Sequence, residues 1–191
     1  MTETIRKNLN RNVAVEGDKV EASGVVFETG FVLTVCHAIE VDSKIKVNGI
    51  EAEIVFASPK DDLLLLACPT IQVERLPLAE AQVTEQVYYV GNPGSLKNAV
   101  IFGRVVAENG MLYCDTAVQM GASGGGLYNM NGDLCGLVVA MKQACHKHDH
   151  LGSTFTVAIP VRVIAPFLNQ ALFVAGAIQD AMRRQYETQV S

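Results

Sequence analysis

Short runs of alternating apolar and polar residues fill most of this chain and predict β-strands. Residues 22–39 hold two β-branched apolar runs around a glycine, and residues 44–58 alternate on both sides of Asn48-Gly49. Asn-Gly pairs recur at 109–110 and 131–132, again between apolar runs. Asn-Gly is a strong signal for a tight hairpin, and many short strands separated by such turns are typical of an antiparallel barrel or sandwich.

Two segments depart from this alternation. Residues 63–68 are apolar throughout, as expected for a strand that is buried on both faces. From Pro160 to about Gln189 apolar residues recur near helical spacing, and the only glycine there is Gly176. This pattern predicts one C-terminal helix, which Pro166 could interrupt.

The composition excludes several classes of protein. A hydrophobic fraction of 49% in 191 residues is enough to build a core, so disorder throughout is excluded. A net charge of −5 argues against a nucleic-acid partner, and no run of about 18 apolar residues predicts a membrane span. The polar start has no secretory pattern, so we expect a cytoplasmic protein, of viral or bacterial origin, with free thiols at its five cysteines.

One serine, Ser123, lies among four glycines in the segment MGASGGG, residues 120–126. A nucleophilic serine needs a tight turn and backbone N–H groups aimed at the developing oxyanion, and the N–H groups of Gly121 and Ser123 are the candidates. A plain turn or a phosphate-binding loop would share the glycines. A phosphate loop should open a helix with Lys and Ser/Thr, whereas a strand and a hairpin pattern follow here.

A serine nucleophile needs a base, and the base needs a carboxylate that orients it. His37 ends an apolar strand pattern, and Asp61 and Asp62 precede the apolar run at 63–68. Each feature is weak alone, since such a histidine is more often a rim residue and such an acidic pair a solvated turn. The order His, Asp, Ser along the chain is that of the chymotrypsin architecture.

Five motifs in one order resemble the trypsin-like (chymotrypsin-fold) serine proteases, and among them the HtrA-type and small viral or bacterial members. They are SGVVFETGFVLTVCHAI, DDLLLLA, GNPG, CDTAVQMGASGGGLYNMNGDLCGLV and FTVAIPVRVI, and they extend over residues 20–166. Alignment of the leucines in the second motif selects Asp62 rather than Asp61. The resemblance therefore implies a catalytic triad of His37, Asp62 and Ser123, with Gly121 and Ser123 as the oxyanion hole.

The resemblance also implies an all-β fold of two antiparallel six-stranded β-barrels with a C-terminal α-helix. We expect the first barrel, with the base and the acid, in residues 1–80. The second barrel, with the nucleophile, is expected in residues 81–160, and the helix in residues 161–191. The helix exceeds what a compact barrel protease needs, so it either packs on the second barrel or carries an oligomer or partner contact.

The implied function is that of a serine endopeptidase, which cuts specific protein substrates through an acyl-enzyme and needs no cofactor. The resemblance places the substrate pocket at Ala117, Val118, Val138, Val139, Ala140, Met141 and Thr156. None of these residues is acidic, so an apolar side chain is expected before the cut rather than Arg or Lys. Two alternatives stay open: a catalytically silent protease-fold binding module, and an esterase or acyltransferase on the same site.

Two sequence features are not explained by the protease assignment, a group of three histidines and a cysteine next to His37. His146, His148 and His150 alternate, so on a strand they would share a face and could bind Zn²⁺ or Ni²⁺. A solvated loop is the preferred interpretation, with a pH-responsive rim as a third, so we expect no metal. Cys36 stands beside His37 where the family has alanine, and we interpret it as a small buried thiol.

Overall fold

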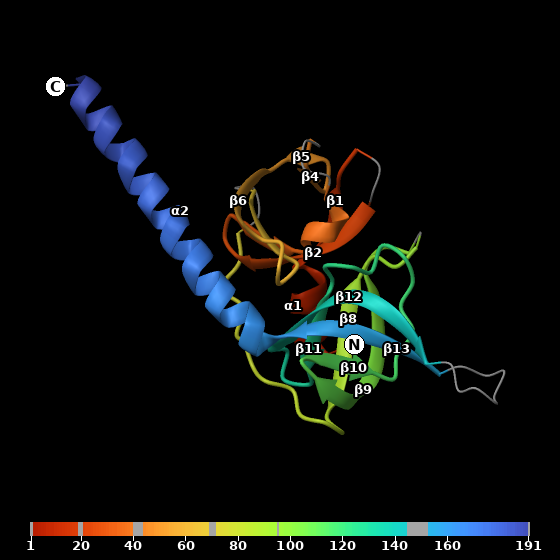
Figure 1. The fold of residues 1–191 in the computed structure, drawn as a ribbon. Helices are drawn as coiled ribbons and strands as arrows, with labels where there is room; N and C mark the ends of the chain where they lie inside the picture. Colours follow the sequence, from red (N-terminus) through yellow and green to blue (C-terminus); the bar gives the residue numbers. More distant parts are fainter. Residues whose placement is uncertain are drawn as a thin grey trace.

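Two β-sheets carry most of the described chain, and a long helix follows them (Figure 1). The computed structural model describes residues 2–18, 21–39, 44–68, 72–94, 96–144 and 153–190. The first sheet contains β1 (Asn12–Glu16), β2 (Glu21–Glu28), β3 (Phe31–Thr34), β4 (Lys46–Val47), β5 (Ile50–Glu51), β6 (Glu53–Ser58) and β7 (Leu63–Ala67). The second contains β8 (Gln86–Gly91), β9 (Ala99–Asn109), β10 (Met111–Cys114), β11 (Gly126–Asn129), β12 (Leu134–Ala144) and β13 (Ser153–Pro160). The helices are α1 (Glu3–Leu9), the 3-10 turn η1 (Cys36–Ala38) and α2 (Val161–Val190).

Over the residues that the structure describes, the first sheet has seven strands in the order β5-β4-β1-β2-β3-β7-β6 and does not close into a barrel. This corrects the predicted six-stranded barrel. One edge is the hairpin of β4 and β5, which turns at Asn48-Gly49 with positive φ at both residues, and the other edge is β6, which pairs with β7 and not with β5 among the described strands. β7 lies inside the sheet between β3 and β6, and Leu63 to Leu66 are at most 2% exposed, as the apolar run predicted.

The second sheet closes into a six-stranded barrel in the order β10-β13-β12-β11-β8-β9, as predicted. Its interior is an apolar core that includes Tyr89, Leu112 and Leu127. Tyr88 and Tyr128, on the outside of β8 and β11, belong instead to a larger core shared with the first sheet and α2. This shared core packs the barrel against the first sheet and α2.

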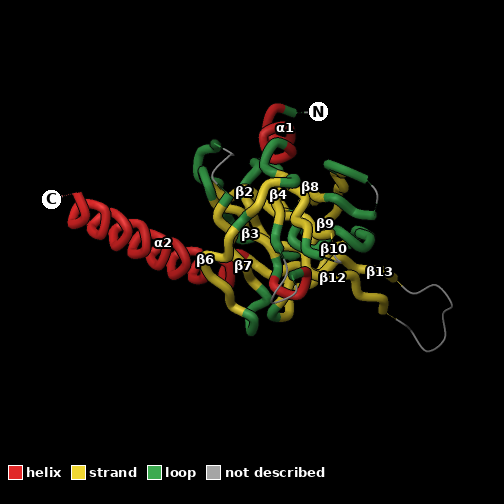
Figure 2. Tube along the Cα trace, turned by 90° about the horizontal axis from the view of Figure 1, so that it is seen from above, coloured by secondary structure: helices red, strands yellow, loops and turns green. Residues whose placement is uncertain are grey.

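The long helix α2 begins directly after β13 and packs against β6, β7, β12 and β13. Leu168 is fully buried, and the Phe167 ring lies 5.5 Å from the Phe56 ring. The helix is confirmed, but the interruption at Pro166 is wrong, because α2 continues through this proline. The C-terminal half of α2 extends away from both sheets (Figures 1 and 2).

The short helix α1 was not predicted from the sequence. Thr2 caps it by accepting a hydrogen bond from the Ile5 N–H at 3.4 Å. Buried Asn8 donates to the Tyr88 hydroxyl at 2.8 Å and to the Gly132 carbonyl oxygen at 2.9 Å. Seven residues make too few turns for a periodic apolar pattern, so the contacts of Ile5 and Asn8 with the barrel are what hold this helix.

Candidate active site

His37 lies in η1, directly after β3, and its partner is Asp62. The imidazole Nδ1 lies 2.6 Å from Asp62 Oδ2, and the backbone N–H of His37 donates to Asp62 Oδ1 at 2.8 Å. Thr34 at the end of β3 pairs with Leu64 in β7, so the residues just after β3 and just before β7 are neighbours. One carboxylate therefore fixes both the backbone and the ring of His37.

The neighbouring acid, Asp61, makes different contacts. Its carboxylate accepts a hydrogen bond from Ser58 Oγ at 2.7 Å and lies 3.9 Å from Lys60 Nζ. Asp62 has φ +56°, a left-handed conformation that aspartate tolerates better than most residues. This backbone conformation turns Asp62 toward the histidine while Asp61 stays engaged in its own turn.

The carboxylate of Asp62 raises the pKa of His37 above its usual value. The hydrogen bond to Asp62 is the largest cause, partial burial of the ring opposes it, and attraction to the Asp62 charge adds to it. An ionised carboxylate can only accept, so Nδ1 keeps its proton and Nε2 carries the lone pair of the neutral ring. His37 is therefore a stronger base than a free histidine, and Nε2 is the atom that takes a proton.

The raised pKa of His37 predicts how activity and stability depend on pH. Proton abstraction needs the neutral ring, so kcat/KM should rise with pH and level off only above the ordinary histidine pKa of about 6.5. The stabilising effect of the His37–Asp62 pair has the opposite trend. It is complete below the unfolded-state pKa and is lost as pH rises through the folded-state pKa. A pH–rate profile with its midpoint below 6.5 would contradict the first expectation, and thermal unfolding at several pH values tests the second.

Ser123 lies in the loop before β11, and its hydroxyl is bonded away from the histidine. Ser123 Oγ donates to the Val139 carbonyl oxygen at 3.1 Å, and within the described part of the chain no hydrogen bond joins Ser123 to His37. The loop still packs against the strand that leads to His37, since a Cβ at Gly124 would lie 2.5 Å from Thr34 Oγ1. The structure thus joins two of the three predicted catalytic residues. The third lies in an adjacent loop, where rotation about χ1 of Ser123 redirects the hydroxyl.

The two predicted oxyanion donors are N–H groups in a tight turn. The Ala122 N–H donates to the Gln119 carbonyl oxygen at 3.1 Å, and Gly121 inside this turn has φ +87°, a conformation that favours glycine. Among the residues that the structure describes, the N–H groups of Gly121 and Ser123 have no hydrogen-bond acceptor. Two N–H groups without acceptors, two residues apart in one loop, are available to bind an anionic oxygen.

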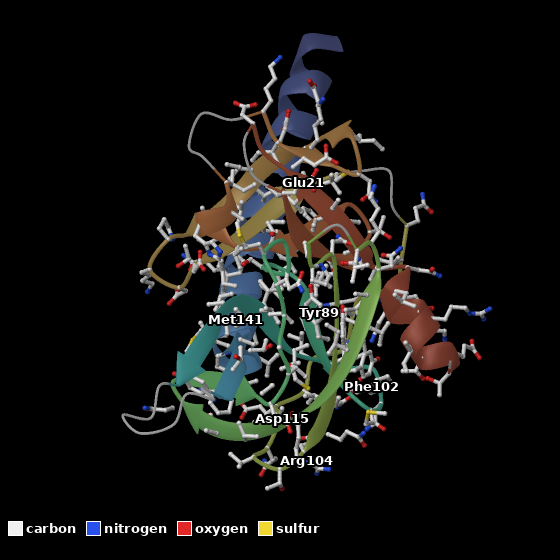
Figure 3. All side chains as sticks on the ribbon, turned by 90° about the vertical axis from the view of Figure 1, so that its right-hand side faces the viewer. Glu21, Tyr89, Phe102, Arg104, Asp115 and Met141 are labelled. Atoms are coloured by element: carbon white, nitrogen blue, oxygen red, sulfur yellow. The ribbon has the colours of Figure 1, made fainter. Side chains whose placement is uncertain are left out.

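The predicted pocket residues come from the segment before the Ser123 loop and from β12 and β13. β12 lies beside the loop, because the Gly124 N–H donates to the Val138 carbonyl oxygen at 2.7 Å. Met141 in β12 pairs with Thr156 in β13, and Figure 3 shows Met141 at the side of the barrel. Val118, Val138 and Thr156 are buried, Val139 is half-buried, and Ala117, Ala140 and Met141 are exposed.

Residues 22–137, more than half of the chain, match the family described as the trypsin-like peptidase domain. The chain belongs to the trypsin-like peptidases. A probable periplasmic serine endoprotease DegP-like of Chlamydia trachomatis is 28% identical to it over 181 residues, which cover 83% of this chain and 36% of the relative. Two solved structures share its fold, each with a TM-score of 0.73 and 22% sequence identity. The serine endoprotease from Yersinia pestis matches over 88% of this chain and 65% of its own chain. The HtrA-type protease AlgW with a tripeptide matches over 87% of this chain and 61% of its own chain. The predicted family and its chymotrypsin-like fold are confirmed.

This trypsin-like peptidase spans about a third of the length of the curated relatives that it matches. Those relatives are named periplasmic, which contradicts the cytoplasmic location predicted from the sequence. That prediction rested on the polar first residues, and a chain that covers a third of its relatives supports no such conclusion from where it begins. Among the described helices, none combines the length and the apolar character needed to cross a membrane.

Two further sequence features concern a possible metal site and Cys36. His146, His148 and His150 fall outside the described residues, and within the described ones no group of three or more His, Cys, Asp or Glu side chains could hold a metal ion. Cys36 donates from Sγ to the Leu63 carbonyl oxygen at 3.0 Å. Burial and the Asp62 charge raise the pKa of the Cys36 thiol, so it stays protonated and does not compete as a nucleophile.

Proposed function

We propose that this trypsin-like peptidase is a serine endopeptidase that cleaves protein substrates through an acyl-enzyme at Ser123. The observation that carries the proposal is the His37–Asp62 pair at 2.6 Å, beside a loop whose Gly121 and Ser123 N–H groups lack acceptors. A base held in one tautomer and a preformed anion site are the two elements that serine catalysis needs. The DegP-like relatives, named as serine endoproteases, support the same reaction.

The proposed mechanism starts when the Ser123 hydroxyl leaves Val139 and turns to His37. Nε2 of His37 takes the hydroxyl proton while Oγ attacks the peptide carbonyl carbon, and Asp62 stabilises the imidazolium. The carbonyl oxygen becomes an oxyanion that the N–H groups of Gly121 and Ser123 bind. The tetrahedral intermediate then collapses, the peptide C–N bond breaks, and His37 gives the proton to the leaving amine. Water, deprotonated by His37, releases the acid product and restores Ser123.

A fluorophosphonate probe tests the proposal, because it reacts only with an activated serine. We expect one covalent label per chain, located on Ser123 by peptide mass spectrometry. Labelling should slow below the pKa of His37, because the protonated ring cannot take the hydroxyl proton. Intact, folded protein that takes up no label at pH 8 would overturn the proposal.

One observation favours a second candidate, the catalytically silent binding module. The Ser123 hydroxyl donates to the Val139 carbonyl oxygen, and a serine held there permanently would not reach the base. The two candidates differ in one measurable property. A silent module would bind a protein partner but would leave both the fluorophosphonate and a fluorescein-labelled casein unreacted.

For specificity we propose a small-to-medium apolar residue before the cut. The seven pocket residues named above carry no charge that would pair with Arg or Lys. A cleavage profile on a proteome-derived peptide library measures this preference. A profile dominated by Arg, Lys or Gln before the cut would contradict it.

Two proposals concern the chain as a whole. We propose residues 1–80, 81–160 and 161–191 as its structural units, because β1 to β7, β8 to β13 and α2 fall into these three ranges. We also propose a periplasmic location, which rests on the names of the relatives and is tested by fractionation of the source cells.

We further propose that the exposed face of α2 around Phe173 contacts a second copy of the chain. Phe173 is 79% exposed although Ala171 and Ala175 on the same helix are buried, and a large apolar side chain in water gains free energy from a contact that covers it. Light scattering of Phe173→Asp should show a smaller assembly than the parent. Asn169→Asp adds the same charge at another exposed position of α2 and is the control. A parent that is already monomeric would contradict the contact.

A further inference from the structure

A cluster of buried hydroxyl groups lies beneath the Ser123 loop, and the established family assignment gives it no role. Ser23 in β2 is fully buried, and its Oγ donates to the Gly121 carbonyl oxygen at 2.8 Å while accepting the Asn92 N–H at 2.8 Å. Tyr89 in β8 is also fully buried, and its hydroxyl donates to the Ala122 carbonyl oxygen at 3.3 Å. Ser23 thus comes from the first sheet and Tyr89 from the barrel, and both reach the same loop.

Each of the three peptides between Met120 and Ser123 has its carbonyl oxygen held by a hydrogen bond from outside this segment. The Gly94 N–H donates to the Met120 carbonyl oxygen, Ser23 Oγ to that of Gly121, and the Tyr89 hydroxyl to that of Ala122. The Gly125 N–H also donates to the Ala122 carbonyl oxygen, at 3.0 Å. The three peptide planes from residue 120 to residue 123 therefore have fixed orientations.

These orientations decide where the two free N–H groups point. In a trans peptide, the C=O of one residue and the N–H of the next point in opposite directions. The hydrogen bond to the Met120 carbonyl oxygen therefore fixes the direction of the Gly121 N–H. The hydrogen bond to the Ala122 carbonyl oxygen likewise fixes the direction of the Ser123 N–H. The Gly121–Ala122 peptide between them is held by Ser23, so a flip of either neighbour would have to strain or break this bond. The backbone N–H of Ser23 adds a fourth contact, at 2.8 Å from the Ser123 carbonyl oxygen.

The glycines on both sides of Tyr89 fit this arrangement. A Cβ at Gly91 would lie 1.7 Å from the Tyr89 hydroxyl oxygen, and a Cβ at Gly125 would lie 2.4 Å from Cε2 of the same ring. The ring therefore occupies space that only glycine leaves on each side, within the barrel that Figure 3 shows around Tyr89. Burial also raises the pKa of Tyr89, so its hydroxyl stays protonated and donates.

We propose that Ser23 and Tyr89 are positioning residues that hold the Ser123 loop in its oxyanion-binding conformation before substrate arrives. This inference rests on the proposed endopeptidase function. Neither side chain touches the substrate, and both act through the carbonyl oxygens of Gly121 and Ala122. A preorganised donor pair stabilises the transition state without reorganisation during the reaction, so its loosening should lower kcat and leave KM unchanged.

The test compares Tyr89→Phe with Tyr88→Phe. Both tyrosines are fully buried neighbours in β8, but the hydroxyl of Tyr88 joins Asn8 in α1, whereas that of Tyr89 joins Ala122 in the loop. On casein, we expect Tyr89→Phe to lower kcat about fivefold at unchanged KM, the effect of one neutral hydrogen bond, and Tyr88→Phe to stay within about twofold of the parent. Equal kcat values for the two variants would overturn the role of Tyr89.

Ser23→Ala tests the role of the second residue. It removes the hydrogen-bond partner of both the Gly121 carbonyl oxygen and the Asn92 N–H. We expect it to lower kcat by on the order of tenfold to a hundredfold, below the loss for a whole oxyanion donor. Fluorophosphonate labelling to completion counts the active chains, so kcat per labelled chain separates poor positioning from partial unfolding. If kcat per labelled chain in Ser23→Ala equals that of the parent, Ser23 has no positioning role. A parent that neither labels nor cleaves casein would instead refute the endopeptidase function itself.

Discussion

Ser123→Ala is expected to lower the rate of casein hydrolysis by on the order of 10⁶-fold while the protein stays folded. The variant removes the only nucleophilic oxygen of the proposed site, so the residual rate would come from transition-state binding by the Gly121 and Ser123 N–H groups, which remain. Stability should change little, since Ser123 Oγ makes one hydrogen bond, to Val139, worth about 1 kcal/mol. Initial rates and thermal unfolding measure the two effects.

The pKa of His37 serves as an internal control for the same variant. The pKa of His37 is raised by Asp62, and no hydrogen bond from Ser123 contributes to it in the described structure. A proton NMR titration should therefore give the same His37 pKa in Ser123→Ala and in the parent. Unchanged casein cleavage by the alanine variant would show that another residue is the nucleophile, and a shifted His37 pKa would show that the variant disturbs the base.

Local sequence signals predicted those parts of the fold that short-range physics decides. Asn48-Gly49 adopts the positive φ values that such a pair favours, and the apolar run before Cys68 is the interior strand β7. The closure of the first sheet was not predicted correctly. Whether β4 and β5 extend an edge or complete a barrel depends on which distant strands pair, and alternation along the chain does not encode that choice.

The same limit applies to the site. The sequence singled out Ser123 and Gly121, because glycines cluster around one hydroxyl within a few residues. It did not single out Ser23 or Tyr89 as parts of the site. Ser23 bonds to Gly121 across 98 positions, and Tyr89 to Ala122 across 33. A serine at the start of an apolar strand and a tyrosine inside one are common, so only the folded chain reveals their shared contact with the loop.

Asp62→Asn is expected to lower kcat/KM at neutral pH by about 10⁴-fold. Asparagine keeps the size of the side chain and tolerates the left-handed backbone at this position, so the turn before β7 should persist. The carboxylate that accepts from His37 Nδ1 would be lost, and an amide N–H in its place would favour the tautomer with the proton on Nε2. That tautomer cannot take the proton of Ser123. The pKa of His37 should also fall, because its largest raising contribution is removed.

Asp61→Asn is the matched control, one residue earlier in the same turn. Its carboxylate interacts with Ser58 and Lys60 rather than with His37, so activity should stay within about twofold of the parent, as for most surface substitutions. Both variants remove one negative charge, so the comparison cancels any effect of net charge on substrate binding. Steady-state rates on casein and NMR titration of His37 give the two readouts. Equal losses of activity in the two variants would mean that the hydrogen bond from His37 to Asp62 does not activate the histidine as a base. Asp62 would then not be the acid of the proposed triad.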